Sequence, residues 1–226
     1  MKKSLFLGLI VLFSFSCKNN NKSVAEIKTP ESQKEQSEIQ QKIAKANGLN
    51  AFKDVEQLQF TFNVKVGDSI RSKRNWTWHP KSGEIRLTQG DISQIYKKDG
   101  ELSEKEKEMD HKFINDSYWL FFPFQMVWSD AKISKESKTQ APISKREMNR
   151  IIVSYPQGGY TPGDSYEIYY DEEMMIREWV YNSADGKRKS PYTWEDYKEY
   201  KGIKIAQSHK SEDGNVEIFF TNIKVK

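Results

Sequence analysis

Residues 58–79 read LQFTFNVKVGDSIRSKRNWTWH, and this stretch decides the fold class. Its first half places an apolar side chain at every second position, namely Leu58, Phe60, Phe62, Val64 and Val66. That period of two is typical of a β-strand with one buried face. Gly67-Asp68 predicts a hairpin turn, and the returning strand to His79 carries Trp76 and Trp78 on one face. We expect the apolar sets of both strands to lie on the same concave side of a sheet.

Segments with the same period of two continue along most of the chain. Further strands are expected at 85–87, 92–96, 150–155, 166–170, 175–181, 192–200, 203–208 and 216–225. In the last segment the apolar parity changes, which predicts a β-bulge near Thr221. The fold class we predict is mainly β: a strongly curved antiparallel sheet of about 9–11 strands that forms an open half-barrel, with a few short inserted helices.

Two helices are expected within this sheet. The first begins at the capping-box pair Ser37 and Gln40 and ends at Gly48, and the second runs from Ser103 to Ser117. Residues 118–128, YWLFFPFQMVW, follow directly and are the most apolar run after the N-terminal leader. They fit a buried strand or a helix-to-strand corner, and Pro123 argues against a central strand.

The N-terminus has the pattern of a bacterial lipoprotein signal peptide. Two lysines precede the apolar residues 5–13, small residues follow, and Cys17 is the only cysteine of the chain. Such a helix is about 15 Å long, half of a ~30 Å hydrocarbon core. We therefore predict a signal peptide at 1–16, a lipidated flexible tether at 17–36 and a single β domain at 37–226. An ordinary secretory signal with a free thiol, or a cytosolic chain with a hydrophobic start, are the alternatives, and Ser14 stands where leucine is most common.

Composition and motifs offer little support for catalysis. Removing Lys2 and Lys3 with the leader lowers the formal net charge of +4 by two, and the remaining lysines alternate with acidic residues, so we expect no nucleic-acid partner. The three histidines, His79, His111 and His209, are far apart in sequence, which disfavours a zinc site. No nucleophile elbow, phosphate loop or dinucleotide fingerprint occurs. We predict no catalytic residues, metal or cofactor, and a hydrolase using His79 or His111 is the weaker alternative.

Large aromatic side chains are the main candidates for a binding site. We predict that an apolar ligand contacts eight of them: Phe60, Phe62, Trp76, Trp78, Trp119, Phe121, Phe122 and Phe124. A curved sheet with an inserted helical lid can enclose an apolar cavity. The alternative is a filled core in which these rings pack against one another.

Two blocks of sequence resemble a known family. Residues 115–124, NDSYWLFFPF, and 158–166, GGYTPGDSY, are similar to signature blocks of Gram-negative lipoproteins whose fold is similar to the outer-membrane lipoprotein carriers LolA and LolB. The resemblance would cover most of residues 40–226. It implies an open curved sheet wrapped over short helices, with an apolar concavity that receives acyl chains in the carriers. LolA itself is soluble, whereas Cys17 predicts an anchor, as in LolB.

These observations predict a function in the cell envelope. We expect a membrane-anchored lipoprotein, held through its N-terminal lipid in the outer membrane and facing the periplasm, that binds an acyl chain or another apolar ligand. The alternative is a structural or assembly lipoprotein that binds an envelope protein and has no ligand cavity.

Overall fold

The computed structural model describes residues 30–156 and 160–226, and side chains from residue 38 onward. In these ranges the chain forms three helices, α1 (Pro30–Ala46), α2 (Leu49–Phe52) and α3 (Glu104–Trp128). Thirteen strands accompany them: β1 (Leu58–Val66), β2 (Ser69–His79), β3 (Glu84–Gln89), β4 (Ile92–Lys97), β5 (Lys132–Ile133), β6 (Ser137–Gln140), β7 (Glu147–Ser154), β8 (Ser165–Tyr170), β9 (Ile176–Asn182), β10 (Lys189–Thr193), β11 (Glu195–Tyr200), β12 (Ile203–Lys210) and β13 (Val216–Val225).

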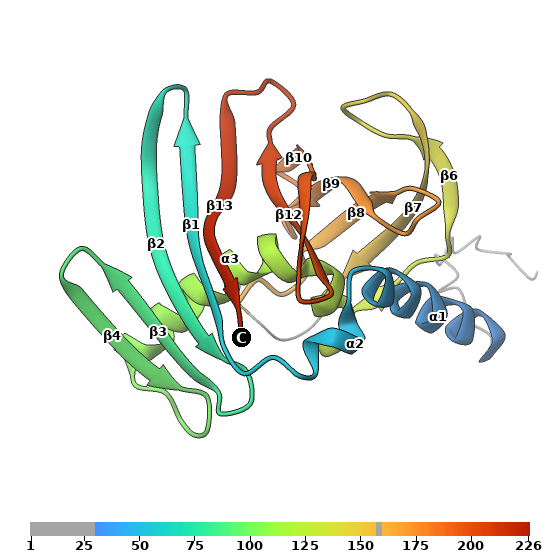
Figure 1. The fold of residues 1–226 in the computed structure, drawn as a ribbon. Helices are drawn as coiled ribbons and strands as arrows, with labels where there is room; N and C mark the ends of the chain where they lie inside the picture. The colour runs from blue at the N-terminus through green and yellow to red at the C-terminus, as the bar shows by residue number, and fades with distance from the viewer. Residues whose placement is uncertain (1–29, 157–159) are drawn as a thin grey trace, which may run out of the picture.

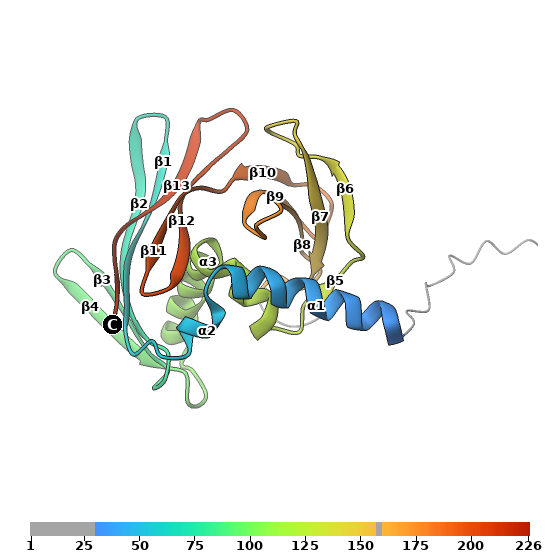
Figure 2. The same cartoon turned by 45° about the vertical axis from the view of Figure 1, so that its right-hand side comes forward.

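The strands form two antiparallel sheets that curve around α3 (Figures 1 and 2). The larger sheet has the order β11-β12-β13-β1-β2-β3-β4, and the smaller has the order β10-β9-β8-β7-β5, with β6 also paired to β7. An isolated β-bridge between Tyr192 of β10 and Ser211, the residue after β12, links the two sheets. The predicted class, a mainly β fold with an open, curved antiparallel sheet, is confirmed. The strand count exceeds the expected 9–11, partly because the short strands β5 and β6 carry no clear alternation.

The β1–β2 hairpin has the predicted register. Leu58 lies opposite Trp78 and Phe60 lies opposite Trp76, so the apolar residues of both strands point to one side of the sheet. The bulge predicted near Thr221 is also confirmed. Thr61 pairs with Thr221 while Gln59 pairs with Lys224, which leaves one extra residue on β13, and Asn222 there has a φ of 54°.

The apolar run 118–128 is helical, so the predicted strand or helix-to-strand corner is wrong. α3 continues through this run to Trp128, with non-helical dihedrals at Phe121 (φ −122°, ψ 22°) and Pro123 two residues later. Proline has no N–H for the carbonyl four residues earlier, and its ring disfavours the preceding turn. The proline therefore bends the helix instead of ending it, because both halves of α3 bury apolar side chains.

The first helix starts earlier than predicted. α1 begins at Pro30, inside the segment expected to be a flexible tether, and not at Ser37. Proline is well suited to the first position of a helix, and the Glu, Gln and Lys residues after it are good helix formers. Gly48 ends the α1 turn as expected, with a φ of 99°. A Cβ atom at Gly48 would lie 2.1 Å from the Gly202 carbonyl oxygen, so this contact between the residue before α2 and the β11–β12 turn requires glycine.

The segment 192–200, expected to be one strand, is divided between the two sheets. β10 ends at Thr193 in the smaller sheet, and β11 begins at Glu195 in the larger one. Trp194 lies between them, is buried, and donates its backbone N–H to the Arg177 carbonyl at 2.7 Å. Burial of this one side chain sets the corner, which a pattern of alternation does not reveal.

The interior consists of two main apolar clusters, one under each sheet, and α3 contributes to both. The larger cluster packs β1, β2, β3, β12 and β13 against one face of α3. The smaller packs β7, β8 and β9 against the other face, together with Ile39 and Ile43 of α1. No helix in the described ranges has the length and apolar character needed to cross a membrane.

Candidate functional site

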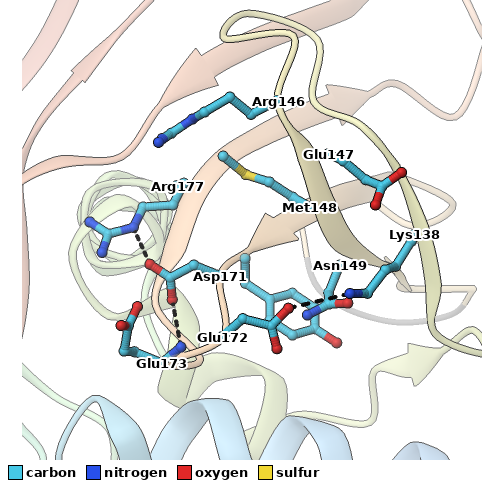
Figure 3. Close-up of a pocket in the computed structure, with 10 residues that line it drawn as sticks. Lys138, Arg146, Glu147, Met148, Asn149, Asp171, Glu172, Glu173 and Arg177 are labelled. Atoms are coloured by element: carbon cyan, nitrogen blue, oxygen red, sulfur yellow. Dashed lines mark hydrogen bonds and ion pairs between the residues drawn. The ribbon is translucent and has the colours of Figure 1, made fainter.

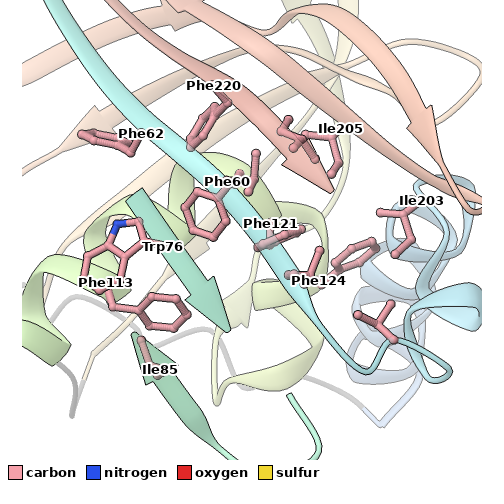
Figure 4. Close-up of a cluster of buried hydrophobic side chains, with 14 of the residues drawn as sticks. Phe60, Phe62, Trp76, Ile85, Phe113, Phe121, Phe124, Ile203, Ile205 and Phe220 are labelled. Carbon is pink, nitrogen blue, oxygen red and sulfur yellow. The ribbon is translucent and has the colours of Figure 1, made fainter. Parts of the chain in front are cut away.

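The concave side of the larger sheet is the predicted ligand-binding face, and β1 and β2 form its wall. Phe60, Phe62 and Trp76 point inward and are buried (Figure 4). Trp78, near the end of β2, is partly exposed. Phe121 and Phe124 of α3 approach this wall from inside the concavity. Six of the eight predicted residues, counting Trp78, thus share this cluster.

The other two predicted residues belong mainly to the second cluster. Phe122 packs under the smaller sheet, 5.3 Å between ring centroids from Trp179. Trp119 is partly buried, contacts both clusters, and lies 4.4 Å from the Trp179 ring. Neighbouring positions on a helix point about 100° apart, so Phe121 and Phe122 face different sheets. The eight residues therefore do not line a single concave face.

Aromatic rings occupy the concavity in this structure. Phe60 lies 6.2 Å from Phe121 and 6.0 Å from Phe220, and Phe62 lies 5.7 Å from Phe220, mostly in edge-to-face geometry. These distances are typical of packed aromatic pairs. In this conformation the deepest rings contact one another, and access for a ligand depends on the rim.

Three aromatic side chains beside the end of α3, Phe52, Trp78 and Trp128, form the rim of the larger cluster. Trp128 is 42% exposed, and its ring lies 4.8 Å from Phe52 and 6.3 Å from Trp78. Phe124 lies 5.4 Å from Trp128 and so connects the rim to the buried rings. Phe52 and Trp128 were not among the predicted site residues. Phe52 ends α2, a helix of only four residues that begins after Gly48, and so short a helix shows no periodic pattern that would mark a buried face.

A buried carboxylate holds the middle of α3 against β2. Asp116 has no exposed surface and accepts hydrogen bonds from Arg74 Nε at 2.7 Å, Arg74 Nη2 at 2.6 Å and Trp76 Nε1 at 2.8 Å. Burial raises the pKa of Asp116, and the hydrogen bonds from Arg74 and Trp76 offset only part of this rise. This bidentate contact fixes α3 at the start of its apolar half.

A second carboxylate ties the first half of α3 to both sheets. Asp110 accepts hydrogen bonds from the Tyr96 hydroxyl at 2.6 Å and the Tyr160 hydroxyl at 2.8 Å, and Lys98 Nζ lies at 2.7 Å. Tyr96 belongs to β4, whereas Tyr160 lies in the connection between β7 and β8. Burial and the hydrogen bond to Asp110 raise the pKa of Tyr160 to about 12, so its hydroxyl stays a donor at neutral pH. Asp116 and Asp110 together hold α3 N-terminal to the bend, and the bend leaves Pro123–Trp128 beyond them.

The histidines lie in three different environments. His79 is partly exposed and contacts Gln57 at 3.2 Å, and His111 is exposed and stacks on Tyr160. His209 is fully buried between Trp119, Trp194 and Phe220. Burial lowers the pKa of His209 to about 3, although the nearby Thr193 and Trp119 carbonyls oppose this. His209 is therefore a neutral core residue, which the sequence pattern did not distinguish from a surface one.

Asp116 and Ser117, an acid and a hydroxyl that could in principle serve a hydrolase together with a histidine, have other partners. Asp116 is bonded to Arg74 and Trp76, and the Ser117 hydroxyl donates to the Ile114 carbonyl at 3.1 Å. Within 30–156 and 160–226, no three His, Cys, Asp or Glu side chains gather as metal ligands would. Cys17, the predicted lipidation site, lies outside the described residues, as do Gly158 and Gly159 of the second signature block.

A polar hollow of about 490 Å³ opens on the smaller sheet, between β6, β7 and the turn after β8 (Figure 3). Its charged side chains pair mainly with one another: Arg177 donates to Asp171, and Lys138 lies 3.4 Å from Glu172. The hollow offers no apolar lining comparable to the aromatic rim, and two ion pairs already join four of its charged side chains.

Comparison with known proteins gives similarity in solved structures only. No protein-family model matches the chain, and no curated protein matches it. A LolA superfamily protein from Nitrosomonas europaea is 9% identical, with 84% of this chain and 93% of that one covered and a TM-score of 0.48. An outer-membrane lipoprotein-sorting protein domain from Vibrio parahaemolyticus is 10% identical, covering 85% and 93%, with a TM-score of 0.46. A DUF1329 family protein from Desulfovibrio piger is 7% identical, covering 86% and 93%, with a TM-score of 0.46.

Proposed function

We propose that this chain is a membrane-anchored lipoprotein of the cell envelope that binds an acyl chain or another apolar ligand on the concave side of its larger sheet. Cys17 supplies the anchor, and the protein acts by binding, without catalysis. The observation that carries the proposal is the aromatic rim of Phe52, Trp78 and Trp128, which Phe124 connects to the aromatic interior. A large exposed tryptophan at such a position favours contact with an apolar partner.

The bend of α3 supports a route for the ligand. Asp110 and Asp116 hold the helix before the bend, while Pro123–Trp128 follows it, without a comparable buried ion pair in the described residues. Pro123 also leaves the helical carbonyl of Trp119 without its usual donor, which weakens the coupling between the two halves. A ligand that displaces the rings of Phe124 and Trp128 would replace aromatic contacts with acyl contacts at small net loss of apolar burial.

Brominated fatty acid tests this proposal, because bromine quenches tryptophan fluorescence only at contact. We expect quenching of the purified chain to fall strongly when Trp78 and Trp128 are both replaced by Phe. Trp194→Phe, which changes a buried tryptophan under the other sheet, is the matched control and should leave the quenching in place. Equal quenching in all three proteins would count against binding at the rim.

The second candidate is a structural or assembly lipoprotein that binds an envelope protein, and the filled concavity favours it. Phe60, Phe62 and Phe121 are almost fully buried, and the Phe60 and Phe121 rings pack against each other with their centroids 6.2 Å apart. This candidate would be favoured if the chain bound no fatty acid and if Trp78→Ala lowered the free energy of unfolding as much as the loss of a fully packed core aromatic residue does.

A further inference from the structure

The free edge of the larger sheet is the feature that the proposed function does not use. β4 pairs with β3 on one side, and in the described ranges no strand covers its other side; Figures 1 and 2 show it at the outer edge of the molecule. Two large apolar side chains stand on it, Ile92 at 66% and Ile95 at 49% exposure. An exposed edge of this kind is a template for pairing with another strand.

The hydrogen-bond pattern shows which groups face outward. Lys98 N–H donates to the Gly83 carbonyl at 3.1 Å, continuing the register in which Ile85 lies opposite Tyr96. Hydrogen-bonded pairs alternate along an antiparallel ladder, so the even-numbered residues of β4 bond to β3. The amides and carbonyls of Ser93, Ile95 and Lys97 therefore point away from the sheet.

The other sheet edges carry devices that prevent pairing, which β4 lacks. β10 contains Pro191, β11 has a left-handed residue at Asp196 (φ 52°), and β5 and β6 have only two and four residues. Proline, irregular backbone and short length are common ways to protect an edge. The one charge within β4, Lys97, is paired with Asp99 at 2.6 Å.

We propose that β4 binds β4 of a second copy of this chain, antiparallel about a two-fold axis at Gln94, which joins the two larger sheets. In this register Asp91 lies opposite Lys97 of the second copy, Ser93 opposite Ile95, and Ile92 opposite Tyr96. The outward-facing odd residues meet one another, as an antiparallel ladder requires. A two-fold at Ile95 would instead place Asp91 opposite Asp99, and one at Ser93 would place Asp91 opposite Ile95. Only the axis at Gln94 sets Asp91 opposite a lysine, so charge complementarity favours it.

The contact is small, so the dimer is expected to be weak in dilute solution. Two strands of six residues bury less than the roughly 1,200 Å² of a stable interface. Confinement of anchored chains to one membrane would raise their effective concentration and favour the pair. The inference itself rests on the edge and does not require the proposed lipid binding.

Cysteine cross-linking of the full chain tests the register. In a Cys17→Ala background, Gln94→Cys places the only thiols opposite each other, at a distance a disulfide can span. The reaction is run at high protein concentration, because the Cys17→Ala change removes the anchor that would otherwise concentrate the chains. We expect roughly tenfold more oxidised dimer than from Glu199→Cys, an exposed position on the β11 edge, because only the β4 thiols are held together. Ile95→Pro, added to Gln94→Cys, removes an outward N–H and should abolish the dimer.

A charge swap tests the same contact independently, in case the proline variant does not fold. Asp91→Lys alone should weaken cross-linking, because it places two lysines, at positions 91 and 97, opposite each other across the interface. Lys97→Asp added to it should restore the dimer. Equal cross-linking from Glu199→Cys, stronger cross-linking through Ile95→Cys than through Gln94→Cys, or no rescue by the swap would each overturn the proposal.

Discussion

Replacing His209 by Gln should remove a large part of the pH dependence of stability between pH 7.5 and 5. The His209 ring is buried among aromatic side chains, and burial lowers its pKa to about 3 from the ordinary value of 6.5. Only the unfolded chain binds a proton at this site in that interval. Stability from His209 is therefore complete above pH 6.5 and is lost as the pH falls toward 3. From the unfolded pKa of 6.5, the loss at pH 5 is about 2 kcal/mol.

Urea unfolding followed by circular dichroism measures this effect in wild type, His209→Gln and His79→Gln at each pH. His79→Gln is the matched control, a replacement of histidine by glutamine at a partly exposed position outside the aromatic core. Glutamine in the buried site will lower stability at every pH, so the slope is the quantity compared. A His209→Gln slope equal to that of wild type would refute a neutral, buried imidazole.

Three further predictions concern the anchor, α3 and the rim. Cys17→Ala should move the chain out of the membrane fraction and abolish acyl labelling, and unchanged labelling would contradict lipidation at Cys17. Arg74→Ala should lower the free energy of unfolding by about 3 kcal/mol, because Asp116 stays buried without its charged partner. A loss below about 1 kcal/mol is typical of an exposed ion pair and would contradict a buried Arg74–Asp116 contact. Trp78→Ala should weaken uptake of a fluorescent fatty acid while lowering stability by less than the ~3–5 kcal/mol of a fully packed aromatic residue. Normal uptake in that variant would exclude Trp78 from the binding site.

Periodicity was enough to predict the sheet. The alternation in 58–66 and 70–79 defines which side chains point inward, and the observed pairing of Phe60 with Trp76 follows from it. The parity change after Phe220 likewise revealed the bulge, since an extra residue must reverse the side-chain direction.

Tertiary packing determined what periodicity did not. Residues 118–128 are apolar at nearly every position because α3 lies between two sheets, and such a helix shows no polar face. For the same reason, Phe121 and Phe122 look equivalent in sequence but contact different clusters. The rim formed by Phe52 and Trp128 joins residues far apart in the chain, so no local pattern identifies it.

Native mass spectrometry of the chain purified with Cys17→Ala, without added lipid, tests the central claim most directly. The account predicts a population heavier than the polypeptide by one acyl-chain ligand, which Trp78→Ala reduces. A polypeptide mass alone, with no adduct even after incubation with fatty acid, would contradict apolar ligand binding by this protein.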